Sequence, residues 1–259
     1  PERAYPMYIT EDGYEFTYFD LSQAEARIVA YQWNVRALIE NFELAADGST
    51  DVHRLNAARI FQCDYDDIPT SDRTEHGTPT KRYLGKRCVH GLNYRMQAPK
   101  LGEVCGIPLT QAQEAYSSYH QAFPEIQRAW EDTVRTVRKD RMLFTPLGRR
   151  LIFLERITEE GMDSIIAFIP QATIGDKVSS VIYKCHEDKR WPSTALVKLN
   201  IHDALIAEHE IKDREIVTKI MKEHAEEPIM VRGVPVVIPT EFKHSVAGED
   251  GVHRWSTLK

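Results

Sequence analysis

With 259 residues and 42% hydrophobic content, the chain is long and apolar enough for one large or two modest packed domains. Its net charge of −6 argues against a general polyanion-binding surface, and its 4 cysteines have neither the spacing of a zinc site nor that of a disulfide framework. No apolar run approaches the roughly 18–20 residues of a membrane-spanning helix, and the N-terminal stretch PERAYPMYIT lacks the regions of a signal peptide. We therefore expect a cytoplasmic protein with free thiols and no membrane contact.

The first predicted elements are a strand and a helix that follows it. The stretch YEFTYFD, residues 14–20, alternates apolar and polar side chains and predicts a strand that ends at Asp20. Apolar residues at helical spacing in residues 21–42 predict a helix that begins close to Asp20 and Ser22. Residues 64–80 are polar, contain two prolines and predict a loop that ends in a Thr-Pro-Thr helix start. Asp20 is thus expected at a strand-to-helix junction.

A basic segment follows this loop. Residues 1–80 contain 15 acidic and 6 basic side chains, whereas residues 81–100 contain six Lys or Arg and neither Asp nor Glu. A local cationic block in an acidic protein indicates one specific anionic ligand, although a solvated helix face remains the plain alternative. We expect residues 81–98 to form a helix.

Four side chains recur on this predicted helix at four-residue intervals: Arg82, Lys86, His90 and Tyr94. At about 100° per residue they lie within about 120° of one another, along about 18 Å of helix. The two cations suit phosphate oxygens and the ring-bearing end suits a sugar or base, so the row fits a nucleoside triphosphate. Gly85 and Gly91 each disfavour the helix by about 1 kcal/mol, which predicts close packing against the backbone there.

The rest of the chain predicts a bent or divided helix, a hairpin, a second helix, a tight hairpin, an amphipathic helix and a final strand before a polar tail. Their ranges in that order are 110–140, 142–154, 162–186, 195–210, 213–227 and 234–242. The order predicts an α+β fold, an antiparallel sheet with a helical subdomain inserted after its first strand and helix.

Two carboxylates are expected at the edge of this sheet. Asp20 ends the first strand and Asp203 lies at the tip of the hairpin 195–210, a separation of 183 positions. Two such groups in one cleft repel unless divalent cations lie between them, and hard oxygen ligands beside phosphate suit Mg²⁺. Taken singly, Asp20 also fits a helix N-cap and Asp203 fits a turn.

Three segments resemble motifs of family A DNA polymerases, the DNA polymerase I type. FDLSQAEARIVAY (19–31) resembles the first motif, Asp-x-Ser-Gln-x-Glu-x-Arg; the basic helix resembles the fingers motif, Arg-x-x-x-Lys-x-x-x-aromatic-Gly-x-x-Tyr; and IHDAL resembles the third motif, His-Asp-Glu. Smaller similarities, in the family's order, are DVHR (51–54), PLGRRL (146–151) and PQATIGD (170–176). The similarity spans roughly residues 15–210.

The resemblance implies a palm sheet with an inserted fingers subdomain. The first part of the palm is expected at residues 1–33, the fingers at 34–140 and the second part of the palm at 141–259. The thumb of the family is expected to be absent, so the chain would be a fragment or one subunit of a split polymerase. The resemblance further implies primer-template DNA and dNTPs as partners, with a second polypeptide that carries thumb and exonuclease-like domains, in a bacterial or phage-infected host cell and with a phage-type origin.

The resemblance also implies a role for each site residue. Asp20 and Asp203 would hold two Mg²⁺ ions for phosphoryl transfer, and Lys86 would also protonate the departing pyrophosphate. The nucleotide-binding residues would be Arg82, Lys86, His90, Tyr94, Glu25 and Gln23, with Glu25 crowding the sugar 2′ position. The residues in contact with DNA would be His202, Arg149, Arg150 and Gln171.

Two residues depart from the family pattern. The family has Phe or Tyr where this chain has His90, the position that senses the nucleotide sugar. It has Glu where this chain has Ala204, the less essential acid of the third motif. Sugar discrimination and the contribution of a third carboxylate therefore stay open.

Three other functions remain as alternatives. A single-subunit RNA polymerase also has His-Asp in its third motif, but Glu25 would obstruct a 2′ hydroxyl. A metal phosphohydrolase of the His-Asp type would use His53 and His90 as further ligands, but it leaves the basic row unexplained. A non-catalytic DNA-binding subunit that retains the fold is favoured by Ala204 and disfavoured by the two intact aspartates.

Overall fold

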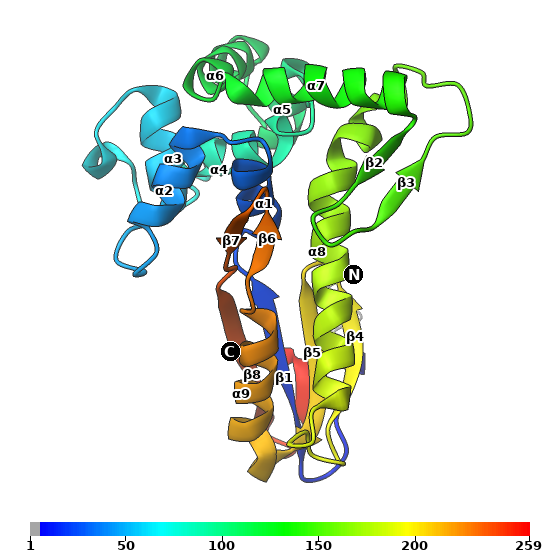
Figure 1. Cartoon of the computed structure of the whole chain (residues 1–259). Helices are drawn as coiled ribbons and strands as arrows, with labels where there is room; N and C mark the ends of the chain where they lie inside the picture. Colours follow the sequence, from blue (N-terminus) through cyan, green and yellow to red (C-terminus); the bar gives the residue numbers. More distant parts are fainter. Residues whose placement is uncertain (1–5) are drawn as a thin grey trace. The chain divides into compact units, whose positions relative to one another are not determined.

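The computed structural model describes residues 6–259, which form two compact units (Figure 1). The sheet unit comprises residues 6–24 and 172–259, and the helical unit comprises residues 25–171. The long helix α8 (Met162–Glu187) contributes its first part to the helical unit and its second part to the sheet unit.

The sheet unit is built on a five-stranded antiparallel sheet in the order β4-β5-β1-β8-β9. Its strands are β1 (Tyr14–Leu21), β4 (Leu196–Ile201), β5 (Ala204–Glu210), β8 (Thr240–Ala247) and β9 (His253–Leu258). The central strand β1 therefore pairs with strands that lie more than 180 residues later in the chain, which brings distant motifs together. The predicted α+β class is confirmed.

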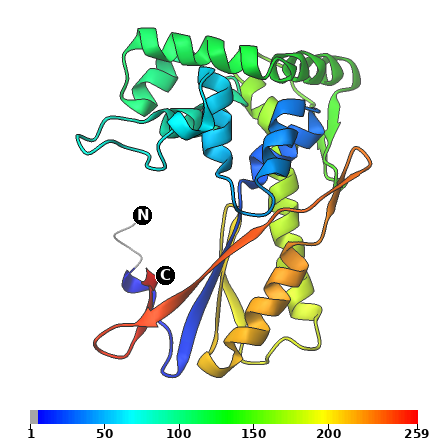
Figure 2. The same cartoon turned by 90° about the vertical axis from the view of Figure 1, so that its left-hand side faces the viewer.

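Two helices cover one face of this sheet, the second part of α8 and α9 (Arg214–Ala225), as Figures 1 and 2 show. In β1 the odd-numbered Phe19 and Leu21 are fully buried, whereas Tyr18 and Asp20 are partly exposed. Because successive side chains of a strand point to opposite faces, Asp20 projects from the face opposite the buried residues.

Polar groups buried in the sheet unit have partners that attach α9 to the sheet and to α8. Glu15 on β1 is fully buried and forms an ion pair with Arg214, the first residue of α9. Lys177 on α8 donates to the carbonyl oxygens of His224 (2.9 Å) and Glu227 (2.8 Å) near the end of α9. Burial lowers the Lys177 pKa to about 8, and these carbonyls satisfy an ammonium that would otherwise be costly to bury.

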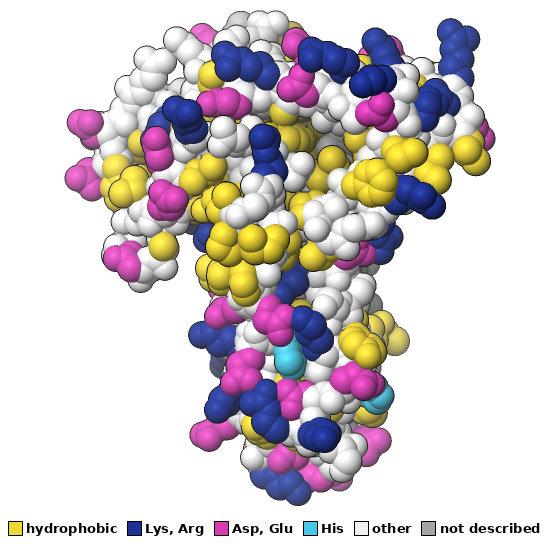
Figure 3. Space-filling model, viewed as in Figure 1, with side chains coloured by type: hydrophobic (Ala, Val, Ile, Leu, Met, Phe, Trp, Pro, Cys, Tyr) yellow, Lys and Arg dark blue, Asp and Glu magenta, His cyan; other side chains and the backbone are white. Residues whose placement is uncertain are grey.

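The outer face of α8 and α9 carries mixed charges. Figure 3 shows acidic and basic side chains interspersed over this part of the sheet unit, and they form ion pairs such as Arg190 with Asp188 and Glu223 (each 2.7 Å). A surface of both signs does not attract a polyanion as a continuous basic patch does.

The helical unit consists of seven helices, a short 3₁₀ turn, a small hairpin and the start of α8. The helices are α1 (Ala24–Gln32), α2 (Arg36–Leu44), α3 (Val52–Phe61), α4 (Lys81–Leu92), α5 (Ala98–Cys105), α6 (Leu109–Ala122) and α7 (Glu125–Asp140). The turn is η2 (Tyr65–Asp67), and the hairpin is β2 (Met142–Phe144) with β3 (Arg150–Ile152). The predicted division of residues 110–140 at Pro124 is observed between α6 and α7.

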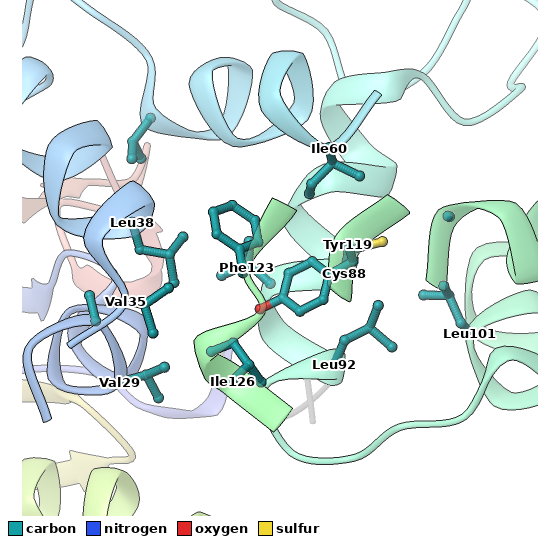
Figure 4. Packing of buried hydrophobic residues seen from close by; sticks show 14 of the residues in the cluster. Val29, Val35, Leu38, Ile60, Cys88, Leu92, Leu101, Tyr119, Phe123 and Ile126 are labelled. Atoms are coloured by element: carbon teal, nitrogen blue, oxygen red, sulfur yellow. The ribbon is translucent and has the colours of Figure 1, made fainter. Parts of the chain in front are cut away.

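The core of the helical unit surrounds Tyr119 (Figure 4). Phe123 and Ile126, which follow it along the chain, face Leu92 of α4 and Ile60 of α3, and all five side chains are fully buried. The Tyr119 hydroxyl donates to Oδ1 of Asn93 (2.5 Å), so the aromatic ring fills the core without an unpaired polar group.

The predicted helix 81–98 is wrong in its length. Helix α4 ends at Leu92, and Gly91 O accepts the amides of both Tyr94 (3.0 Å) and Met96 (3.2 Å). Arg95 between them has φ +65°, a left-handed conformation that terminates a helix. Tyr94 therefore follows the helix and is not part of a continuous row with Arg82, Lys86 and His90.

The predicted single strand at 234–242 is also wrong, as is the polar tail after it. Residues Val234–Val236 form β7, which pairs with β6 (Ile229–Val231) in a separate ribbon, and β8 begins only at Thr240. Pro239 separates them because proline cannot donate to a ladder. The tail contains β9, which pairs with β8.

By length and composition alone α8 is the one helix within residues 6–259 that could cross a membrane, contrary to the expectation from the sequence. Half of its apolar window is buried in the protein. Ile166 and Val178, for example, are almost completely buried, as in the core helix of a folded domain.

Candidate active site

The sheet unit brings the two predicted carboxylates together. Asp20 pairs with Ala204 across β1 and β5, so the tip of the β4–β5 hairpin lies beside the end of β1. The amide of Leu21 donates to the carbonyl oxygen of Asp203 (3.1 Å), which fixes this approach. Burial, the charge of Asp203 and the charge of Glu241 raise the Asp20 pKa to about 6, and a hydrogen bond between the carboxyl groups of Asp20 and Asp203 adds to the shift.

Two neighbours of this pair were missed by the sequence analysis. Glu241 on β8 pairs with Asp20 on the side opposite Ala204, and it is exposed. Tyr18 lies two residues before Asp20 on the same face of β1, and burial followed by the charges of Asp20 and Asp203 raises its pKa to about 12. The register of β8 is invisible in the sequence, so no local signal identifies Glu241.

The backbone is strained close to both aspartates. His202, at the exposed tip of the hairpin, has φ +55°, and Gln23, just after β1, has φ +53°. Non-glycine residues with positive φ are uncommon and are concentrated at functional sites and tight turns. Since Ile201 pairs with Ala204, His202 and Asp203 form a two-residue hairpin loop, whose favoured turn requires positive φ.

The helical unit holds the predicted phosphate-binding residues on α4. Thr80 caps this helix by accepting the amide of Tyr83 (3.3 Å). Lys86 and His90 are exposed, whereas the Arg82 guanidinium contacts Asp51 (Nε to Oδ2, 2.7 Å) and Asp72. The predicted close packing at Gly85 is confirmed, because an added Cβ would lie 2.8 Å from Cβ of Ala57 on α3.

His53 lies beside these cations. Burial, followed by the charge of Lys86, lowers its pKa to about 4, and its Nδ1 has no hydrogen-bond partner within residues 6–259. An uncharged imidazole can form a hydrogen bond, and the charges of Lys86 and Arg82 nearby make its position unfavourable for a metal ion. The DVHR motif signalled this position, but its proximity to α4 is visible only in the structure.

A hydrogen bond joins Tyr94 to Glu25 within the helical unit. The Tyr94 hydroxyl donates to Oε2 of Glu25 (2.9 Å). Burial, followed by the charge of Glu25, raises the Tyr94 pKa well above its ordinary value, so the phenol stays a donor. The two motif residues, 69 positions apart in the chain, are thus adjacent within the helical unit.

Three further predicted residues belong to the helical unit. Arg149 and Arg150 are exposed at the β2–β3 hairpin, and Gln171 is exposed on α8. Their assignment to DNA remains a prediction.

The carboxylate pair suits a divalent cation in its chemistry. Within residues 6–259 no group of three or more His, Cys, Asp or Glu side chains is arranged to hold a metal ion. Mg²⁺, however, is typically bound by one or two carboxylates together with water and substrate phosphates. Asp20 and Asp203 supply two hard oxygen ligands whose mutual repulsion a cation would relieve.

Comparison with known sequences decides the family. The sequence profile of DNA polymerase family A matches residues 2–247 of the chain. The chain belongs to DNA polymerase family A. The family predicted from the three motifs is therefore confirmed, whereas the phage-type origin stays a prediction.

Members of the family include two similar curated proteins. The thermostable DNA polymerase I of Thermus aquaticus is 27% identical over 256 residues, which cover 96% of this chain and 28% of that protein. DNA polymerase I of Borreliella burgdorferi is 27% identical over 223 residues, which cover 82% of this chain and 23% of that protein. The chain therefore spans about a quarter of the length of these relatives.

A solved structure in the family has the same fold. The POL domain of Pol1 from M. smegmatis, in complex with DNA primer-template and dNTP, matches with a TM-score of 0.77. The match has 22% sequence identity and covers 99% of this chain and 43% of that chain. The sheet and helices described above thus form a family A polymerase fold.

Proposed function

We propose that this chain carries out template-directed DNA synthesis, in which the primer 3′ hydroxyl attacks a dNTP and pyrophosphate leaves. The observation that carries this proposal is the meeting of Asp20 and Asp203 in a member of DNA polymerase family A. The sheet unit would act as the palm and the helical unit as the fingers.

Asp20 and Asp203 would be the ligands of two Mg²⁺ ions. Bound there, the ions would activate the primer hydroxyl and stabilise negative charge on the leaving pyrophosphate. The Asp20 pKa, raised by burial and then by the charges of Asp203 and Glu241, supports this role, because a neighbouring cation would stabilise the ionised carboxylate. Ala204 provides no third carboxylate at its own position, but Glu241 brings one to the other side of Asp20.

Arg82 and Lys86 on α4 would bind the triphosphate. The planar guanidinium suits two phosphate oxygens at once, and the exposed ammonium of Lys86 acts as a point charge. Lys86 would also donate a proton to the departing pyrophosphate. The uncharged imidazole of His53 would add a hydrogen bond without extra charge.

Glu25 would select the sugar, with Tyr94 and His90 near the incoming nucleotide. The hydrogen bond from Tyr94 holds the Glu25 carboxylate in one orientation, and a fixed carboxylate would exclude a 2′ hydroxyl by its size. This disfavours the RNA polymerase alternative. Gln23 would contact the nucleotide, while His202, Arg149, Arg150 and Gln171 would contact primer-template DNA.

The proposed partners are primer-template DNA, dNTPs and a second polypeptide with thumb and exonuclease-like domains. The proposed location is the cytoplasm of a bacterium or a phage-infected host cell. Bacterial homologues support the location.

Primer extension tests this function. Asp20→Ala and Asp203→Ala should each abolish Mg²⁺-dependent extension, assayed with the polypeptide that carries the thumb, whereas Asp12→Ala, an exposed acid before β1, should extend as the wild type does. Equal extension by the two site variants would refute the catalytic assignment.

A non-catalytic DNA-binding subunit is the second candidate, because Ala204 stands where the resemblance expects Glu. It predicts DNA binding without extension under any metal condition. The same assay distinguishes the two candidates, since the wild type itself would then be inactive.

A further inference from the structure

Arg82, the proposed triphosphate-binding residue, forms ion pairs with two carboxylates of the helical unit. Its Nε lies 2.7 Å from Oδ2 of Asp51, and its Nη1 contacts Oδ1 of Asp72. The Arg82 side chain is 18% exposed, compared with 28% for Asp51 and 39% for Asp72. These ion pairs are therefore partly sheltered from water, where charge interactions are stronger than at an open surface.

The two carboxylates differ in what else holds them. Asp51 is the N-cap of α3 and accepts the amides of His53 (2.8 Å) and Arg54 (3.4 Å). The side chain of Asp72 has a single hydrogen-bonding partner within residues 6–259, which is Arg82. Displacing Asp51 would uncap a helix, whereas displacing Asp72 breaks one contact.

Asp72 can leave Arg82 without a change in the backbone. Its carbonyl oxygen accepts the amide of Thr80 (3.0 Å), and the Thr80 hydroxyl donates to Ser71 (2.7 Å). The backbone is therefore fixed beside α4, but the more exposed carboxylate needs only a side-chain rotation to reach water.

The charge balance shows what this contact costs a triphosphate. Asp51 and Asp72 both form ion pairs with Arg82, whereas Lys86 is exposed. A polyphosphate that reaches α4 must therefore displace or neutralise one of these carboxylates before it can pair with the Arg82 guanidinium.

We propose that Asp72 is a positioning residue that holds Arg82 in the nucleotide-free protein and competes with the triphosphate for it. Release of Asp72 is coupled to nucleotide binding, because the guanidinium exchanges the Asp72 carboxylate for phosphate oxygens. This inference rests on the proposed role of α4 in triphosphate binding.

A matched pair of substitutions in the loop before α4 tests the competition. Asp72→Asn removes the competing charge with almost no change in shape, and Glu75→Gln removes an equal charge three residues away at an exposed position. Equilibrium binding of dATP and of inorganic tripolyphosphate is measured with Mg²⁺ for the full chain. Asp72→Asn should bind both about three- to tenfold more tightly than the wild type, and Glu75→Gln should agree with the wild type within about twofold. Unchanged or weaker binding by Asp72→Asn overturns the proposal.

A double-mutant cycle separates this inference from the proposed function. If Asp72 acts through Arg82, Asp72→Asn should have no effect in an Arg82→Ala background. Binding that Arg82→Ala leaves unchanged refutes the triphosphate role of α4 itself. Weaker binding by Arg82→Ala together with no gain from Asp72→Asn refutes the competition alone.

Two further measurements exclude a purely structural effect. Asp72→Glu retains the charge, so it should bind dATP and tripolyphosphate as the wild type does. In extension assays Asp72→Asn should lower KM for dNTP and leave kcat unchanged. If Asp72→Asn fails to fold, Asp72→Ser provides the same neutralisation. A gain in affinity that Asp72→Glu shares would overturn the proposal.

Discussion

At the scale of single residues, Asp20 combines an unfavourable environment with a proposed catalytic role. Its carboxyl group is partly buried and lies beside two other acids, Asp203 and Glu241. Interactions that destabilise a folded protein but serve its chemistry are typical of active sites. The cost of this arrangement should be measurable as a dependence of stability on pH.

We expect Asp20→Asn to raise the melting temperature at about pH 8. Between the ordinary pKa of 3.8 and the raised value of about 6, the folded protein retains a proton that the unfolded chain has lost. The free energy of unfolding therefore falls as the pH rises through this window, and the loss is complete above it. The amide removes this loss, so calorimetry without divalent cations should show a larger gain at about pH 8 than at about pH 4. Equal gains at both pH values, or the same gain in Asp12→Asn, would contradict the explanation.

Magnesium should relieve the same repulsion. At about pH 8 a saturating concentration of Mg²⁺, on the order of ten times its dissociation constant, should stabilise the wild type by about 1.4 kcal/mol, or a few degrees. Asp20→Asn and Asp203→Asn should show little of this shift. Potassium chloride at equal ionic strength is the control, and a shift of similar size with it would indicate screening rather than binding.

His90 should influence discrimination at the sugar. It is exposed on α4, so His90→Phe should change the site without disturbing the core. We expect the ratio of deoxynucleotide to dideoxynucleotide incorporation to change by roughly 5- to 150-fold, because one apolar contact is worth about 1–3 kcal/mol. The ratio comes from competition assays on one primer, and an unchanged ratio would remove His90 from the site.

At this scale the sequence predicted which residues lie in the site better than it predicted the contacts that they make. Asp20 and Asp203 could be paired because each ends an element at one edge of a sheet. The contacts of Arg82 with Asp51 and Asp72 could not be predicted, because they depend on how α3 and the loop before α4 pack on α4. Glu241 was missed because its position beside Asp20 depends on the register of β8 against β1.

At the scale of elements, two features of α4 matter: its close packing against α3, and its end at Leu92. Gly85 allows the backbone of α4 to approach α3, since even a methyl group there would lie 2.9 Å from Cα of Ala57. The lack of a side chain thus brings Arg82 and Lys86 close to the N-terminus of α3, where Asp51 and His53 lie.

Gly85→Ala should therefore destabilise the protein, whereas Gly175→Ala should not. A Cβ atom at position 85 would clash with backbone atoms of Ala57. The resulting overpacking should lower the free energy of unfolding by about 1–3 kcal/mol. Gly175 in α8 has nothing within 4 Å of an added Cβ, so alanine should raise the free energy by about 0.5–1 kcal/mol through its helix propensity. Urea denaturation of the two variants gives both values. A stabilising Gly85→Ala would mean that α3 and α4 are less tightly packed than described.

The boundaries of elements were harder to predict than their existence. Helix α4 was predicted to continue to residue 98 because its spacing is helical, but it ends at Leu92, and Arg95 beyond it is left-handed. The tail after β8 has few apolar residues, and it becomes β9 only because β8 offers an unpaired edge. Such tertiary pairing overrides local composition.

At the scale of the whole molecule, charge is distributed locally rather than overall. The chain has a net charge of −6, and the outer face of α8 and α9 has both signs (Figure 3). The proposed binding to DNA should therefore depend on a few specific cations, in contrast to proteins with a continuous basic surface. The order of the three motifs predicted the family correctly. This order can be read from the sequence even where the boundaries of the strands and helices between the motifs were predicted imperfectly.

The salt dependence of DNA binding should be shallow and should identify the residues responsible. Each phosphate contact contributes about −0.9 to the slope of log affinity against log salt concentration. Arg150→Ala, at the exposed start of β3, should reduce the magnitude of the slope by about one unit, because it removes one proposed phosphate contact. Lys222→Ala removes an equal charge from the exposed face of α9 and should leave the slope unchanged. Fluorescence anisotropy of a labelled primer-template over a salt series measures both slopes. Equal losses in the two variants would mean that net charge, and not the β2–β3 hairpin, determines how this polymerase-family chain binds DNA.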